Sequence, residues 1–142
     1  MASRLSEFTL RRRVQFAECD PAGILHFSRF FRFMEEAEHA MWRAVGLTIE
    51  DRESDVGFPR VAAAFDYSAP LQFEDEVEIR IQVVKKSDRS MGYRCTITRQ
   101  GRTVATGTMT IACVDRRSRP LRATSIPADM ADRFEATPAA GG

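Results

Sequence analysis

The chain has 142 residues, of which 44% are hydrophobic and 29% charged, and its 21 Lys and Arg against 20 Asp and Glu leave a net charge of +1. This length fits one domain with a sizeable core, and the balanced charge excludes the strong field that binds nucleic acid or an anionic membrane. No apolar run approaches the roughly 20 residues of a membrane span, and the N-terminal stretch MASRLSEFTLRRR lacks a signal-peptide core. We therefore expect one cytoplasmic domain over residues 1–142.

The first predicted element is a strand over residues 8–16. Its apolar residues recur with a period of two, which is typical of a half-buried strand. They are Phe8, Leu10, Val14 and Phe16. Arg12 interrupts this pattern within the run RRR, and we expect that run to be solvated, with Arg12 near a sheet edge.

A long helix is predicted over residues 28–45. Apolar residues recur there at spacings of three and four, from Phe30 to Val45, and form one stripe that faces a core. Ser28 is the expected N-cap and Gly46 the expected left-handed residue after the helix. The acidic side chains Glu35, Glu36 and Glu38 are expected on a solvated or interface-facing side.

Four further stretches alternate with a period of two and predict strands. They lie within residues 61–67, 73–83, 91–97 and 105–113. The connections KKSDRS and RQGR are short enough for hairpins, and APLQ suggests a turn, so an antiparallel sheet follows. We predict an α+β domain with its core over about residues 8–115, a last helical turn within 127–134 and a disordered tail over 136–142.

The stretch VQFAECDPAGILHFSRFF, placed between the first strand and the helix, resembles the hotdog-fold acyl-CoA thioesterases, in particular the 4-hydroxybenzoyl-CoA thioesterase family. The most specific part is the D-P-A-G-I block at residues 20–24. This resemblance implies a curved antiparallel sheet of about five strands wrapped around one long central helix. It also implies a homodimer joined edge to edge, often assembled into a dimer of dimers, with active sites at the subunit interface. The implied substrate is a small or aromatic acyl-CoA, with no cofactor beyond the coenzyme A of the substrate.

The same resemblance assigns roles to individual residues. Asp20 is the acid that attacks the thioester carbonyl or activates water. Gly57, in V-G-F-P, is similar to a family glycine whose backbone N–H faces the thioester oxygen. Family members carry a tyrosine or histidine seven residues after the acid, where this chain has Phe27 and its histidine, His26, comes one residue earlier.

Chemistry supports the acid but leaves alternatives open. Thioester hydrolysis needs a nucleophile or base and fixed donors for the developing oxyanion, and Asp20 beside the first turn of a helix offers both. Asp20 before a proline can instead simply close a turn, and His26 can serve packing rather than catalysis. Cys19 points to the opposite face of an extended chain. The three cysteines and two histidines follow no disulfide, zinc or H-E-x-x-H spacing, so we predict no metal site.

The remaining candidate residues are expected to contact the substrate. Glu35 can reach a site in a partner subunit, and the hairpin residues Lys85, Lys86, Arg89 and Ser90 are similar to a region near the nucleotide in the family. A second basic cluster follows at residues 116–122. Two alternatives to a thioesterase remain: a hotdog hydratase or dehydratase, which would use His26 paired with an acid, and a non-catalytic acyl-thioester binding or scaffold protein.

Overall fold

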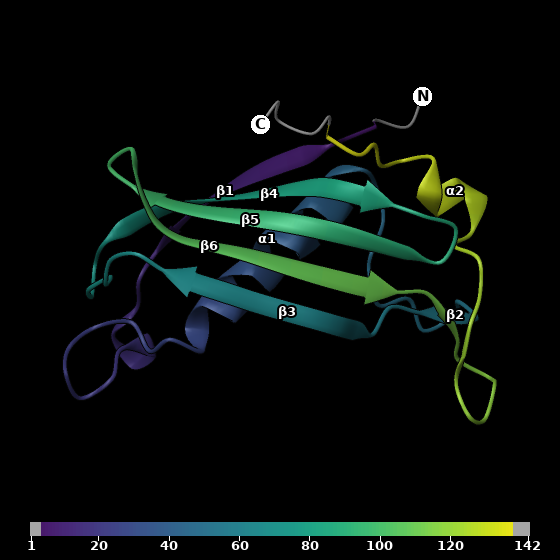
Figure 1. Ribbon diagram of the computed structural model, residues 1–142, viewed down its shortest axis with the longest axis horizontal. Helices are drawn as coiled ribbons and strands as arrows, with labels where there is room; N and C mark the ends of the chain where they lie inside the picture. The colour runs from purple at the N-terminus through teal and green to yellow at the C-terminus, as the bar shows by residue number, and fades with distance from the viewer. Residues whose placement is uncertain (1–3, 138–142) are drawn as a thin grey trace.

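The main sheet of the computed structural model is antiparallel and curves around one long helix (Figure 1). The structure describes residues 4–137. In chain order the elements are β1 (Glu7–Arg13), the 3-10 turn η1 (Phe16–Glu18), α1 (Arg29–Ala44), β2 (Val56–Gly57), β3 (Arg60–Tyr67), β4 (Glu76–Lys86), β5 (Ser90–Arg99), β6 (Arg102–Ala112), β7 (Val114–Asp115), β8 (Arg122–Ala123) and α2 (Ala128–Ala131). The main sheet has the order β1-β4-β5-β6-β3, and β2, β7 and β8 form a small second sheet. Within residues 4–137, no helix has the length and apolar character that crossing a membrane requires.

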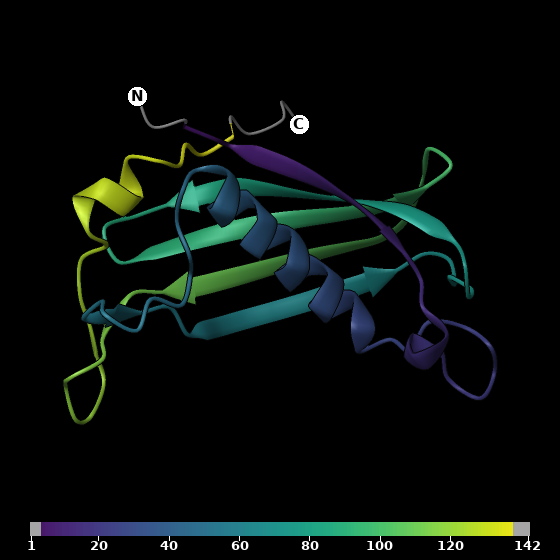
Figure 2. The same ribbon diagram turned by 180° about the vertical axis from the view of Figure 1, so that it is seen from behind.

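The core lies between α1 and one face of the main sheet. Figure 2 shows α1 crossing that face diagonally. The apolar stripe of the helix is buried there, and it comprises Phe30, Phe33, Met34, Ala37, Met41 and Trp42. It packs against inward side chains of β4 and β5 such as Ile79 and Tyr93, and burying each large apolar side chain stabilises the fold by about 1.5–3 kcal/mol. The predicted α+β hotdog architecture is confirmed.

The two ends of α1 differ from each other in how well they were predicted. Gly46 has a φ of +82°, and the N–H groups of Gly46 and Leu47 donate to the carbonyls of Arg43 at 3.0 Å and Trp42 at 2.9 Å, which is the Schellman ending. Ser28 occupies the N-cap position as predicted, but its backbone is already helical and its side chain caps no N–H. Its hydroxyl instead pairs with His26 Nδ1 at 2.7 Å.

The first strand ends earlier than predicted. β1 stops at Arg13, and the chain leaves the sheet after Val14, whose N–H donates to the carbonyl of Asp75 at 2.9 Å. Phe16 therefore lies in η1 with 76% of its surface exposed. Phe73, also expected in a strand, precedes β4 and is exposed, and its ring meets Phe16 edge-on at 5.6 Å.

The predicted hairpins are confirmed. β4 and β5 are joined by residues 87–89, and β5 and β6 by Gln100 and Gly101, whose positive φ values of 51° and 77° form a tight two-residue turn. α2 lies within the predicted helical turn at 127–134. Of the predicted disordered tail, residues 138–142 lie outside the described residues, whereas Thr137 donates its N–H to the carbonyl of Val83 at 2.6 Å.

β3 is an edge strand whose inward face is only partly covered. Val61 and Tyr67 were expected in a half-buried strand, yet they are 60% and 44% exposed. The reason is that α1 lies mainly against β1 and β4. On the inward face of β3, the ring of Phe65 packs over Gly107 of the neighbouring strand β6. A Cβ on that glycine would lie 2.7 Å from the ring.

Candidate active site

Asp20 lies in the turn between η1 and α1, and the fold leaves one of its carboxylate oxygens free. Oδ1 accepts the N–H of Ala22 at 2.8 Å and of Ile24 at 3.4 Å, and the Asp20 N–H donates to the Ile24 carbonyl at 2.8 Å. Gly23, with a φ of +85°, makes this reversal possible. The turn-closing role considered as an alternative is therefore present. However, Oδ2 accepts no hydrogen bond from residues 4–137, so the side chain can still act as a base or nucleophile.

The turn is anchored to α1 by an ion-pair network. The Arg12 guanidinium donates to both oxygens of Glu18 at 2.6 Å and to Glu36 at 3.1 Å, and it lies over the Phe33 ring. Burial would raise the pKa of Glu18, but hydrogen bonds from Arg12 and the Gln15 N–H outweigh it, and the pKa is lowered. The expectation that Arg12 is solvated is wrong, because its side chain is only 14% exposed.

An open depression of about 340 Å³ lies beside the turn. Asp20, Cys19, His26 and Arg29 line it. His26 is exposed, and its Nδ1 pairs with Ser28 rather than with an acid. The Phe27 ring is exposed, while its carbonyl accepts the hydroxyl of Tyr67 at 2.9 Å and so ties the helix entrance to the end of β3.

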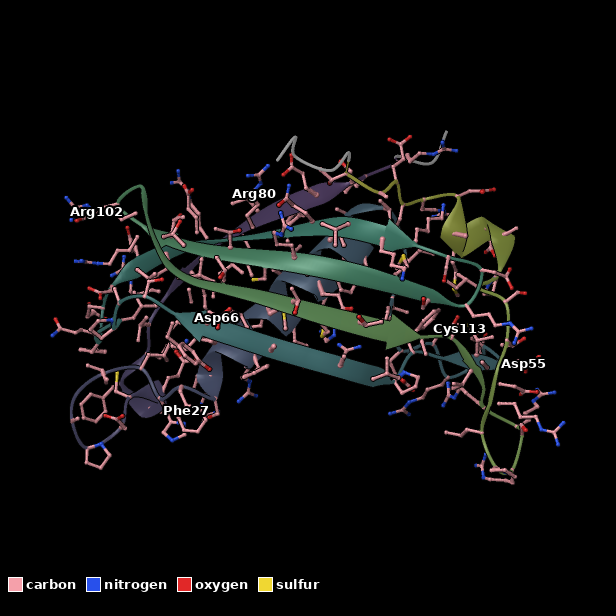
Figure 3. All side chains as sticks on the ribbon, in the orientation of Figure 1. Phe27, Asp55, Asp66, Arg80, Arg102 and Cys113 are labelled. Carbon is pink, nitrogen blue, oxygen red and sulfur yellow. The ribbon has the colours of Figure 1, made fainter. Side chains whose placement is uncertain are left out.

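Gly57 lies at the opposite end of the protomer from Asp20. Figure 3 labels Phe27 and Asp55 at the two ends of the sheet, and Gly57 follows Asp55 by two residues in β2. Gly57 pairs with Val114 of β7, and a Cβ there would lie 3.2 Å from the Arg116 side chain. One chain therefore does not bring the predicted acid and the predicted backbone donor together.

The hairpin between β4 and β5 lies at the Gly57 end of the sheet (Figure 1). Lys86 Nζ donates to the Phe134 carbonyl at 3.0 Å, and Arg89 lies 3.6 Å from Asp88. Ser90 pairs with Ser87 at 2.7 Å, and Lys85 is exposed. The four predicted phosphate contacts therefore lie in and beside one hairpin, and within residues 4–137 only part of their positive charge is paired.

Two of the three glutamates of α1 are on the surface, and the third is not. Glu35 is exposed, 3.5 Å from Arg60. Glu38, expected with it on the solvated side, is 0% exposed, so that prediction is wrong. Burial raises the pKa of Glu38 from 4.5 to about 7, against the opposing effect of the Arg60 charge. The signal was available, because Glu38 lies four residues after Met34 and three before Met41, on the apolar stripe.

An aromatic cluster near the helix entrance was not predicted as part of a site. Phe31 meets Phe65 edge-on at 5.1 Å, Phe65 stacks with Tyr67 at 6.1 Å, and Tyr67 meets Phe30 at 4.9 Å. Phe31, Phe65 and Tyr67 keep exposed surface on the edge of the sheet. Within residues 4–137, no three His, Cys, Asp or Glu side chains are grouped closely enough to hold a metal ion.

Comparisons with known proteins agree with this architecture. A putative esterase from Aquifex aeolicus is 37% identical over 82 residues, which span 56% of this chain and 63% of that relative. A 1,4-dihydroxy-2-naphthoyl-CoA hydrolase from Synechococcus elongatus is 24% identical over 136 residues, 94% of this chain and 98% of the relative. The solved structure of a gentisyl-coenzyme A thioesterase superposes with a TM-score of 0.77 at 30% identity, covering 84% of this chain and 96% of that one. The family model of the thioesterase-like superfamily matches residues 14–134, and the chain belongs to that superfamily.

Proposed function

We propose that this protein is an acyl-CoA thioesterase that hydrolyses aromatic acyl thioesters and uses Asp20 as its nucleophile or general base. The observation that carries the proposal is the Asp20 carboxylate, half-buried in an open depression with Oδ2 free. The aromatic rings of Phe31, Phe65 and Tyr67 nearby offer a surface on which an aromatic acyl group can stack. The relatives named for aromatic CoA thioesters support the same substrate class.

The site is completed in a homodimer. β3 has no neighbour on its outer edge within residues 4–137, and such an edge is a template for pairing with another strand. Antiparallel pairing of β3 with its copy about a two-fold axis brings the start of one strand to the end of the other. Gly57 lies just before β3, and Phe27 is bonded to Tyr67 at its end. The pairing therefore brings Gly57 of each subunit towards Asp20 of the other.

In this dimer the reaction needs only groups that the chain supplies. Oδ2 of Asp20 either attacks the thioester carbon or removes a proton from the attacking water. Direct attack breaks the C–S bond, releases the thiolate and gives a mixed anhydride, which water then hydrolyses to the free acid and the Asp20 carboxylate. The amides of the first turn of α1 donate to the carbonyl oxygen as it gains charge, and Gly57 of the other subunit lines the site beside them. No cofactor or metal takes part. Lys85, Lys86 and Arg89, at the same end of the subunit as Gly57, face the phosphates of coenzyme A.

The shared site can be tested with two inactive variants. Asp20→Asn removes the acid. Gly57→Val adds a branched side chain at a position where a Cβ alone would lie 3.2 Å from the Arg116 side chain. We co-express the two chains with different affinity tags, purify the heterodimer and measure thiol release from benzoyl-, 4-hydroxybenzoyl- and acetyl-CoA. One of its two sites then has both wild-type groups, so we expect about half of the wild-type kcat from two chains that are inactive as homodimers.

Four outcomes decide between the alternatives. An inactive heterodimer with intact fold and dimer size contradicts the shared site. Full activity of the Asp20→Asn homodimer contradicts the role of the acid and favours His26. A wild-type protein that binds these CoA esters but releases no thiol is the non-catalytic scaffold, and hydration of an enoyl-CoA identifies a hydratase. Light scattering tests the dimer of dimers, and fractionation tests the cytoplasmic location, both of which belong to this proposal.

A further inference from the structure

A buried polar network connects the middle of α1 to the start of β3. Glu38 Oε1 accepts Arg60 Nη2 at 2.5 Å, while Oε2 is buried and has no hydrogen-bond partner among residues 4–137. The hydroxyl of Tyr93 lies beside this carboxylate and accepts the indole N–H of Trp42 at 3.1 Å. A buried carboxylate is costly unless its surroundings hold it, so this network needs an explanation beyond packing.

The network ends on the segment that carries Gly57. Arg60, held by Glu38 at one nitrogen, donates another to the carbonyl of Phe58 at 3.3 Å. The Phe58 ring packs edge-on against Trp42 at 5.2 Å. Both contacts act on residues 57–60, where the backbone leaves β2 and enters β3 through an irregular register at Arg60. The course of the backbone directly after Gly57 is thus tied to the Glu38–Arg60 pair.

We propose that Glu38 and Arg60 are positioning residues: the ion pair holds the backbone of residues 57–60, so that Gly57 keeps its place against the thioester in the partner's site. The inference rests on the proposed function. Neither side chain touches substrate. A misplacement of about 1 Å in the backbone that lines the site disturbs the geometry of attack on the thioester, so loosening the pair lowers kcat while binding of coenzyme A, through other groups, is retained.

The state of Glu38 decides how firmly Arg60 is held. The titratable and charged groups around it are Arg60 of β3, Tyr93 of β5, and Glu35 and His39 of α1, with His39 Nε2 3.8 Å from the Glu38 carboxylate. Burial raises the pKa of Glu38 to about 7 and lowers that of His39, so His39 adds little positive charge at neutral pH. Protonated Glu38 attracts Arg60 less, and the wild type at low pH then behaves like Glu38→Gln.

The test measures kcat and KM of wild type, Glu38→Gln, Arg60→Met and the double variant against pH. We expect Glu38→Gln to lower kcat about tenfold above pH 8 while KM changes less than about twofold. Wild-type kcat should fall by the same factor between about pH 8 and pH 6, where Glu38→Gln stays flat. The double variant should be no worse than either single variant, because both break one pair. If the kcat of Glu38→Gln still falls between about pH 8 and pH 6 as it does in the wild type, the proposal is contradicted.

Heterodimers separate positioning from general damage to the fold. When Glu38→Gln is paired with Asp20→Asn, the active site takes Gly57 from the chain with an intact Glu38, and we expect half of the wild-type kcat with the wild-type pH profile. When Glu38→Gln is paired with Gly57→Val, the active site takes Gly57 from the Glu38→Gln chain, and its kcat keeps the tenfold loss. The reverse pattern shows that Glu38 acts on its own Asp20, and equal losses in both show general damage; either result overturns the proposal. The pairing of Asp20→Asn with Gly57→Val reports separately on the proposed function.

Discussion

Glu38→Gln should change the pH dependence of stability by an amount that follows from burial. The pKa of Glu38 rises from 4.5 to about 7 on folding, so the folded protein binds this proton more tightly than the unfolded chain. The stabilisation is fully present below the unfolded pKa and is lost as pH rises through the folded pKa. At about 1.4 kcal/mol per pKa unit, wild type loses about 3 kcal/mol of unfolding free energy between pH 4.5 and pH 8 relative to Glu38→Gln.

Urea unfolding at several pH values measures this difference. The single tryptophan, Trp42, is 1% exposed and reports unfolding by fluorescence. The protein concentration must be fixed, because formation of the proposed dimer would also contribute to the apparent stability. Other carboxylates, including Glu18, titrate in both variants and cancel in the difference. Glu35→Gln is an exposed change one turn earlier. Its unfolding free energy should follow that of wild type across the pH range within about 0.5 kcal/mol. If the difference in unfolding free energy between wild type and Glu38→Gln stays constant from about pH 5 to pH 9, the buried-carboxylate reasoning is refuted.

Three further changes test other parts of the fold. Arg12→Met leaves Glu18 buried without its cation and should cost about 3–5 kcal/mol in urea unfolding, whereas Arg11→Met, whose side chain is 86% exposed, should cost less than about 1 kcal/mol. Gly107→Ala drives a methyl group into the Phe65 ring and should cost about 1–3 kcal/mol, part of which Phe65→Leu in the same chain recovers; an additive double variant would contradict the clash. Trp42→Phe removes the N–H donor of Tyr93 and should lower the unfolding free energy by about 1–3 kcal/mol, and an unchanged urea midpoint would show that this hydrogen bond contributes nothing.

Periodicity predicted the elements well because each long element has one buried face. The stripe from Phe30 to Val45 and the alternation of β4, β5 and β6 reflect burial against each other, and the turn at Gln100 and Gly101 follows from local chemistry. The same rule failed where an apolar residue lies at a boundary. Phe16 and Phe73 continue the pattern of their strands, but the chain has already left the sheet, and they are exposed.

Charged residues were the weakest part of the prediction, because their burial depends on partners distant in the sequence. Arg12 is buried by Glu18 and Glu36, and Glu38 by Arg60, and no local pattern shows those pairs. The position of Glu38 on the apolar stripe was the one usable sign. For the candidate site, the sequence identified residues but not their distances: Asp20 and Gly57 lie at opposite ends of one chain, and the proposed dimer that would bring them together rests on the edge position of β3.

The outer edge of β3, which has no neighbouring strand within residues 4–137, also bears on how the chain behaves before it forms the proposed dimer. A newly synthesised chain exposes eight residues of extended backbone in β3, with Val61 largely exposed, and partly folded chains nearby can pair with them. An open strand of this kind invites indiscriminate aggregation. Charged substitutions along this strand that weaken the proposed pairing therefore have two effects. They remove the proposed shared cleft, and they decide whether the separated chains stay in solution or precipitate.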